Sequence, residues 1–256
     1  HPTDYVDAVL DAVPSEGYRH LDADTVLSPG SGEAALRASG ALVDAVDAVV
    51  GGEVDNAFCA VRPPGHHAEP ARPMGFCLFN SVAVGAEHAR NAFGLARAAV
   101  VDFDVHHGNG TQAMFWDDEG LFYASTHQFP HYPGTGAVDE TGAHGNIANA
   151  PLAPGSGSDA FRKAFERIVI PALDGFRPEI VFISAGFDAH ERDPLAQINL
   201  VEEDYAWATD QLVAVADTHA EGRVVSVLEG GYDLSALASS AAAHVARLMA
   251  VGKKEQ

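Results

Sequence analysis

The sequence predicts an α/β fold with a mostly parallel central β-sheet flanked by helices. Short, nearly continuous apolar runs alternate along the chain with longer segments whose apolar residues recur at helical spacing. Parallel strands covered on both faces have such apolar runs, and alternating strands and helices are typical of βαβ units with right-handed crossovers. Because 256 residues is a common length for one large α/β domain, we expect residues 1–256 to form a single domain.

The N-terminal half contains two predicted helices and three predicted strands. Each helix has apolar residues three and four positions apart, and each strand is an apolar run that stops at proline or at polar residues. In chain order we expect a helix at 33–50, a strand at 57–61, a helix at 81–93, and strands at 98–103 and 121–125.

The C-terminal half continues this alternation, with two interruptions that are rich in glycine, proline and aspartate. In chain order we expect a loop at 130–157, a helix at 159–173, a strand at 180–184, a loop at 189–200, a helix at 202–218, a strand at 224–228 and a helix at 234–251. Long ordered loops at the carboxyl edge of a parallel sheet usually shape a binding site. Both loops are therefore predicted to border one.

The charge balance excludes some kinds of partner. Asp and Glu number 36 against 15 Lys and Arg, which gives a formal net charge of −21. A field of this sign repels phosphate backbones and anionic lipids, so we expect no direct nucleic-acid partner and no membrane partner. Cationic substrates are compatible with it, although the charge can equally serve solubility alone.

Cysteine usage and hydropathy favour a cytoplasmic location. Cys59 and Cys77 are the two cysteines, and their spacing resembles neither a disulfide framework nor a CxxC motif. No apolar run approaches the roughly 18 residues of a membrane span, and no signal peptide is visible. We therefore expect a reducing, cytoplasmic environment.

A candidate metal site follows two of the predicted strands. Asp104 and His106 are two positions apart at a strand end, where strand geometry would point both side chains to one side. Asp188 follows another strand and offers a third ligand, which leaves positions open for water and substrate. A D-x-H triplet alone is weak evidence, and the convergence of several strand-end motifs at one sheet edge strengthens it.

Two further motifs are candidates for proton transfer and charge stabilisation. His66 and His67 follow a proline-rich turn, and they are either exposed loop histidines or a functional pair oriented by partners such as Asp102 and Asn109. Tyr232 follows two glycines, so its phenol either packs at a strand end or donates a hydrogen bond to a developing oxyanion.

The order and spacing of these motifs resemble those of a known protein family. The segments RPPGHHA, GFC, VDFDVHHGNGTQ, SAGFDAHERDPLA and LEGGYDL resemble the zinc-dependent histone deacetylase family, most closely its class II and bacterial deacetylase-like members. The resemblance runs from about residue 20 to residue 250 and implies an arginase/deacetylase-like fold. By motif, it implies that Asp104, His106 and Asp188 bind zinc, that His66 and His67 pair with Asp102 and Asn109 respectively, and that Tyr232 stabilises the transition state.

The resemblance also implies a substrate tunnel and a second ion. It suggests that Gly75, Phe76 and Tyr132 form the tunnel walls, that Leu195 lies at the rim, and that Asp102, Asp104, His106, Ser125 and Thr126 hold a structural potassium ion. Asp22 and Asp24 lie near the segment where relatives place a rim aspartate, without a clear alignment. Family members normally have a further N-terminal segment, which we expect this chain to lack.

The implied activity is removal of acetyl or other acyl groups from the ε-amine of acetyl-lysine in proteins or peptides. The closest alternative is an acetylpolyamine amidohydrolase, which takes small cationic amines, so the expected partners are acetylated lysine side chains or acetylated polyamines. A manganese-dependent ureohydrolase and a non-enzymatic binding module are two further alternatives. The sequence leaves the physiological substrate, the preferred acyl chain and the oligomeric state open.

Overall fold

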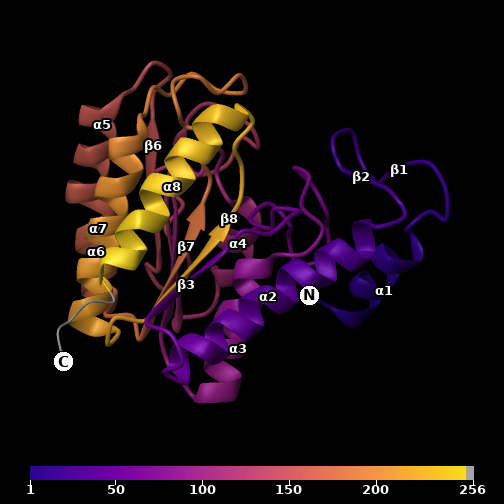
Figure 1. Cartoon of the computed structure of the whole chain (residues 1–256), viewed down its shortest axis with the longest axis horizontal. Helices are drawn as coiled ribbons and strands as arrows, with labels where there is room; N and C mark the ends of the chain where they lie inside the picture. Colours follow the sequence, from indigo (N-terminus) through magenta and orange to yellow (C-terminus); the bar gives the residue numbers. More distant parts are fainter. Residues whose placement is uncertain (252–256) are drawn as a thin grey trace.

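A six-stranded, all-parallel β-sheet forms the centre of the protein, in a computed structural model that describes residues 1–251 (Figure 1). The strand order is β3-β8-β7-β4-β5-β6, and every neighbouring pair is parallel. The strands are β3 Asn56–Cys59, β4 Ala98–Asp102, β5 Leu121–Gln128, β6 Ile147–Leu152, β7 Ile180–Ala185 and β8 Val224–Leu228. The expectation of a parallel α/β sheet is therefore confirmed.

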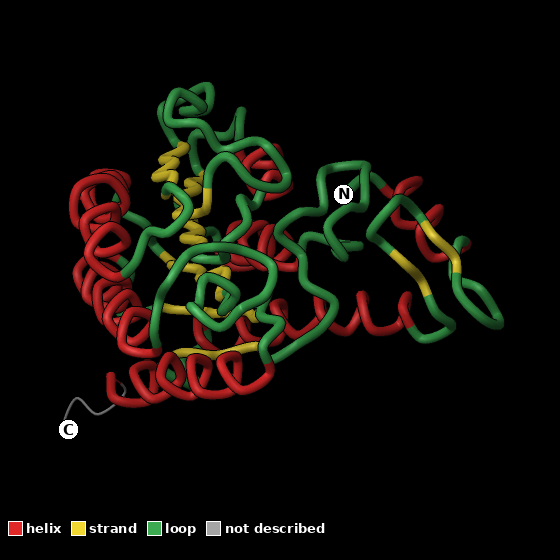
Figure 2. Tube along the Cα trace, turned by 90° about the horizontal axis from the view of Figure 1, so that it is seen from above, coloured by secondary structure: helices red, strands yellow, loops and turns green. Residues whose placement is uncertain are grey.

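Helices cover both faces of the sheet, and Figure 2 shows them on either side of the strands. Alternate residues of β4 point to opposite faces: Ala99 and Val101 belong to one apolar core, and Ala98 and Val100 to the other. The first core contains α5 Ser158–Ala164, α6 Ile170–Phe176, α7 Glu202–His219 and α8 Leu234–Val251, and the second contains α2 Ser31–Val50 and α3 Ser81–Phe93. Burial on both faces explains why the central strands are apolar throughout.

A small N-terminal subassembly lies beside the main sheet in Figure 1. It contains α1 Thr3–Asp11 and a two-stranded antiparallel sheet of β1 Arg19–His20 and β2 Val26–Leu27. Its apolar core joins Tyr5 and Leu27 to Phe79, and the Tyr5 hydroxyl donates a hydrogen bond of 2.7 Å to the Leu78 carbonyl. The strands are two residues long, too short to produce a recognisable alternation in the sequence.

The structure differs from the expectations for residues 130–157 and 159–173. Residues 130–157 were expected to be a loop, but they contain β6, whose apolar pattern is interrupted by Asn149 and Pro151. Proline is tolerated there because β6 is an edge strand. The segment expected to be one helix at 159–173 is helical, but it consists of α5, a π-helical turn at Phe165–Val169 and then α6. Pro171 has no N–H to donate to the preceding turn, which is a physical reason for the wider turn before it.

The carboxyl ends of β4, β5, β7 and β8 lie together at one edge of the sheet. The register pairs Asp102 of β4 with Ser125 of β5 on one side and Ser184 of β7 on the other. A short helix that was not predicted, α4 Asn109–Phe115, begins in the segment just beyond β4. Loops that leave these adjacent strands therefore bring their side chains to a common site. Over the described residues, no helix is both long and apolar enough to cross a membrane.

Candidate active site

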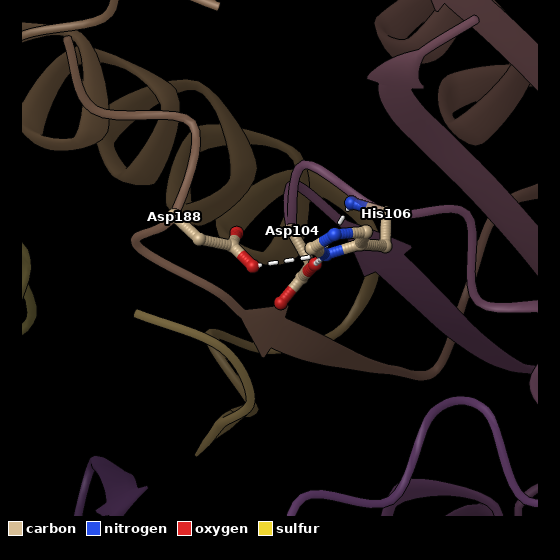
Figure 3. Close-up of side chains that lie close together, drawn as sticks. All are labelled: Asp104, His106 and Asp188. Carbon is tan, nitrogen blue, oxygen red and sulfur yellow. Dashed lines mark hydrogen bonds and ion pairs between the residues drawn. The ribbon is translucent and has the colours of Figure 1, made fainter. Parts of the chain in front are cut away.

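Asp104, His106 and Asp188 form a compact metal-binding group at this edge (Figure 3). One ligand atom from each lies within 4.8 Å of the others, and all three side chains are buried. The His106 Nδ1 atom lies 3.1 Å from Asp104 Oδ1 and 3.0 Å from Asp188 Oδ2. Strand alternation does not explain this convergence, because β4 ends at Asp102. Asp104 and His106 meet in the following turn, where the His106 N–H donates to Asp104 Oδ1 at 2.8 Å.

Backbone groups orient the two carboxylates. The Gly230 N–H donates to Asp104 Oδ2 at 2.8 Å, and the Val105 N–H donates to Asp188 Oδ1 at 2.8 Å. Gly186 packs so closely that a Cβ atom at its position would collide with the Asp104 carboxylate. Hydrogen bonds of this kind fix ligand orientation and tune metal affinity.

The electrostatics of the group favour a bound cation. Burial, together with the neighbouring Asp104 charge, raises the pKa of Asp188 to about 7. Burial alone would lower the pKa of His106, but Asp104 and Asp188 raise it to about 10. Within the described part of the chain, no Lys or Arg forms an ion pair with either carboxylate. Two carboxylate oxygens and one imidazole nitrogen, with further positions open, are a donor set that suits catalytic zinc.

The tandem histidines lie beside this group and have different partners. His66 Nδ1 is 2.9 Å from Asp102 Oδ2, and His67 Nδ1 is 2.9 Å from Asn109 Oδ1. Burial alone would lower the pKa of His66, but Asp102 and the other nearby carboxylates raise it well above its usual value. Burial lowers the pKa of His67 well below its usual value, and the positive charge of His66 adds to this effect.

The amide of Asn109 decides which nitrogen of His67 carries the proton. Its Nδ2 group donates to Glu69 Oε1 at 2.8 Å and to the Met74 sulfur at 3.2 Å, so its oxygen faces His67 as an acceptor. Neutral His67 must therefore hold its proton on Nδ1, which leaves the lone pair on Nε2. His67 and His106 both line the pocket described next.

A pocket of about 210 Å³ leads to the metal-binding group. Besides His67 and His106, its lining brings together residues that the sequence singled out for the tunnel or for catalysis: Gly75, Phe76, Tyr132, Leu195 and Tyr232. The Phe76 and Tyr232 rings meet edge to face with centroids 6.1 Å apart, and the His67 and Tyr132 rings do so at 5.3 Å. The pocket therefore combines aromatic rings with the polar side chains of His67 and His106.

Sequence reasoning missed four polar residues near the site or left them unassigned. Asp24 and His131 line the pocket, and His131 Nε2 is 3.1 Å from the Leu195 carbonyl. Glu229 is buried and accepts from the Gly65 N–H at 2.7 Å and the His66 N–H at 3.2 Å. Asp193 is buried beside Tyr232. Glu229 and Asp193 lie inside motifs that the sequence highlighted, so their position in those motifs could have identified them as site residues.

Two of the residues suggested for potassium, Asp104 and His106, belong to the metal-binding group itself. A third, Asp102, is the last residue of β4 and pairs in register with Ser125 of β5. Ser125 Oγ is 2.9 Å from His127 Nδ1, whereas the buried hydroxyl oxygen of Thr126 has no hydrogen-bond partner in the protein. A buried oxygen without a partner is costly, and a bound ion would satisfy it.

This parallel α/β fold, with a buried Asp-His-Asp group that could hold a metal ion at the carboxyl edge of its sheet, has the architecture of the deacetylase and amidohydrolase class of proteins. A family model of the histone deacetylase domain matches residues 1–248. The chain belongs to the histone deacetylase family.

Known proteins similar to this chain come from bacteria and plants. It is 42% identical to a histone deacetylase-like amidohydrolase of Pseudomonas aeruginosa over 236 residues, covering 91% of this chain and 62% of that protein. It is 44% identical to the chloroplastic histone deacetylase 14 of Arabidopsis thaliana over 224 residues, covering 86% of this chain and 51% of that protein. The crystal structure of the HDA15 HD domain superposes with a TM-score of 0.92 at 38% identity, covering 98% of this chain and 70% of that one.

Proposed function

We propose that this protein is a zinc-dependent deacetylase that removes acetyl groups from the ε-amine of acetyl-lysine in proteins or peptides. The observation that carries the proposal is the pocket itself. Its aromatic side walls, Phe76 and Tyr132, suit an extended aliphatic chain, and His67, His106 and Tyr232 line the same space. The family match over residues 1–248 further supports the proposal that the chain is one catalytic domain.

In this proposal Asp104, His106 and Asp188 hold the metal, and His67 moves the proton. When bound, zinc supplies a Lewis acid that polarises the acetyl carbonyl and lowers the pKa of water toward neutrality. His67 takes the proton of the attacking water on Nε2, because Nδ1 is held by Asn109. It then returns this proton to the departing lysine amine. His66, kept charged by Asp102, provides a positive charge beside the reacting centre.

Tyr232 is the proposed donor to the oxyanion of the tetrahedral intermediate. Burial raises the pKa of its phenol well above the usual value, and the nearby carboxylates Asp188 and Asp104 raise it further, so the hydroxyl keeps its proton for donation. Donors placed where negative charge develops contribute more to the transition state than to the ground state.

Tyr232→Phe is expected to lower kcat by about 10²–10³-fold, because it removes one oxyanion donor without removing the ring. Zinc content is expected to stay at the wild-type level, since Tyr232 is not among the ligands. Steady-state kinetics and elemental analysis of the purified variant measure both quantities. A variant with wild-type kcat would exclude this role for Tyr232.

The experiment that tests the proposed function compares two substrates on zinc-reconstituted protein, with a chelator-treated sample as the control. We expect chelator-sensitive hydrolysis of an acetyl-lysine peptide, with a higher kcat/KM than for acetylspermidine. A reversed preference would move the assignment to polyamines, since the net charge of −21 is compatible with either substrate. Absence of turnover of both would refute amide hydrolysis as proposed.

A binuclear ureohydrolase is the less favoured alternative. Two-metal hydrolases need a second cluster of ligands about 3.5–4 Å from the first ion. In residues 1–251, one group of at least three potential ligands lies close enough together to hold an ion: Asp104, His106 and Asp188. The tandem histidines and Tyr232 occupy the surroundings of that group instead.

We also propose that potassium binds at Asp102, Asp104, His106, Ser125 and Thr126. The support is the register pairing of Asp102 with Ser125, the full burial of Asp102 and Asp104, and the buried hydroxyl of Thr126 that has no hydrogen-bond partner in the protein. A ligand that binds only the folded state at 100 times its Kd stabilises by about 2.7 kcal/mol, which is roughly 5–10 °C in Tm for a chain of this size. Thermal unfolding in KCl and in choline chloride at equal ionic strength measures the effect. Equal Tm values in the two salts would count against the site.

A further inference from the structure

Asp193 is a buried carboxylate that has no role in the chemistry described above. It lies in the loop between β7 and α7, in the same motif as the metal ligand Asp188. Its side-chain Oδ2 accepts from the Tyr232 N–H at 2.8 Å and from the Asp233 N–H at 3.3 Å, and Oδ1 accepts from the Leu195 N–H at 3.0 Å. Three backbone donors, drawn from two separate segments, therefore converge on one carboxylate.

Other hydrogen bonds hold the start of this segment, since the Glu229 N–H donates to the Ala185 carbonyl at 3.0 Å and the Gly230 N–H donates to Asp104, whereas the Tyr232 N–H donates to Asp193. Tyr232 follows Gly230 and Gly231, and Gly231 has a φ of 142°, in a region that favours glycine. Residues 229–233 lie between β8 and α8 and belong to neither element. The contact with Asp193 therefore joins the Tyr232 backbone to the loop between β7 and α7.

The same loop also contributes to the pocket rim. Leu195 lines the pocket, and its carbonyl lies 3.1 Å from His131 Nε2. Asp193 therefore connects the rim residue Leu195 and the backbone of Tyr232 through one side chain. Asp233, whose N–H also donates to Asp193, precedes α8 directly. Its side-chain Oδ1 accepts from the Ala236 N–H at 2.7 Å in the first turn of that helix.

We propose that Asp193 is a positioning residue that holds the Tyr232 backbone so that the phenol points into the pocket. The inference rests on the proposed role of Tyr232 as an oxyanion donor. Asp193 itself does not line the pocket and does not contact the metal ligands through any described hydrogen bond. Its effect on catalysis would then pass through the backbones that it holds, those of Tyr232 and Leu195, and dependence on Tyr232 distinguishes the proposed role from one that merely stabilises the fold.

A double-mutant cycle tests this dependence. Asp193→Asn preserves size but replaces one acceptor oxygen with an amide donor, so it cannot accept from both Tyr232 and Leu195. We expect kcat to fall about 10- to 100-fold with KM within about twofold, because the lost interaction acts in the transition state. In the Tyr232→Phe background, the same change is expected to lower kcat by less than about twofold. Equal losses in both backgrounds would overturn the proposal.

The chain offers a matched control in Asp204. This carboxylate is also buried, and it accepts from the Val201 N–H and the Ser158 hydroxyl at the start of α7. Asp204→Asn should destabilise the fold without displacing Tyr232, so kcat of its folded fraction is expected to stay near the wild-type value. If Asp204→Asn lowers kcat as much as Asp193→Asn does, a positioning role for Asp193 is excluded.

A measurement that does not depend on turnover separates this inference from the proposed function. The Tyr232 amide of the wild-type protein is expected to exchange with deuterium at least about tenfold more slowly than an unprotected loop amide, because it is bound to Asp193. Asp193→Ala, which leaves neither acceptor oxygen, should remove this protection. Unprotected exchange in the wild type would overturn the inference, even if Asp193→Ala failed to fold. Failure of the wild type to hydrolyse any acetylated amine would refute the proposed function alone.

Discussion

Asp188→Ala is expected to abolish stoichiometric zinc binding and to lower kcat/KM by about 10³-fold or more, because metal catalysis contributes several kcal/mol to the transition state. Asp188 supplies one of the three ligands. His106 Nδ1 lies 3.0 Å from Asp188 Oδ2 and 3.1 Å from Asp104 Oδ1. With one carboxylate removed, the remaining pair cannot hold the ion at three points. Elemental analysis of zinc and turnover of an acetyl-lysine peptide measure the two losses.

An exposed aspartate on a helix provides the control for this prediction. Asp210 lies on α7 and accepts from Arg247 Nε at 2.6 Å on the protein surface. Asp210→Ala is expected to retain both zinc and activity, since surface ion pairs contribute little to stability. Full zinc occupancy in Asp188→Ala would show that the ion binds elsewhere.

His67→Gln is expected to lower kcat by about 10²–10⁴-fold while zinc content remains unchanged, because the change removes the proposed general base but none of the metal ligands. The physical reason is the tautomer set by Asn109, which leaves His67 Nε2 as the base in the pocket. Steady-state kinetics on zinc-reconstituted protein provides the measurement, with KM expected to change much less than kcat.

The matched control for His67 is a histidine on the surface of α3. His88 Nε2 is 2.6 Å from Asp47 on α2, and His88→Gln should leave kcat at the wild-type level. If His67→Gln retained kcat within about tenfold of the wild type, another group would have to serve as the base, since general-base catalysis contributes at least about 10²-fold.

The catalytic edge of the sheet shows why some of the site was predictable. Strands buried on both faces require continuous apolar runs, so a polar motif at the end of such a run identifies a loop at the sheet edge. Asp104, His106 and Asp188 were found in this way, and the structure places them in one buried group. The local geometry was not predictable, because Asp104 and His106 meet in a turn beyond β4 and not on the strand.

Elements with weak or interrupted patterns were missed for a related reason. β6 is an edge strand, so it tolerates Asn149 and Pro151 and lacks the continuous apolar run of a central strand. The two-residue strands β1 and β2 are too short for any periodicity. They matter for the site nonetheless, because Asp24 lies in the turn between them, lines the pocket and accepts from the Gly75 N–H at 3.1 Å.

The sequence by itself determined the parallel α/β class and the strand ends at which the metal ligands lie, because burial and periodicity are local properties of the chain. Only the tertiary structure decided which side chains support those residues. Asp193 meets Tyr232 across 39 residues, and Glu229 meets Gly65 across 164. Such pairings depend on strand order, register and loop path together. No local pattern of residues encodes them, so they emerge only when the whole sheet edge is assembled.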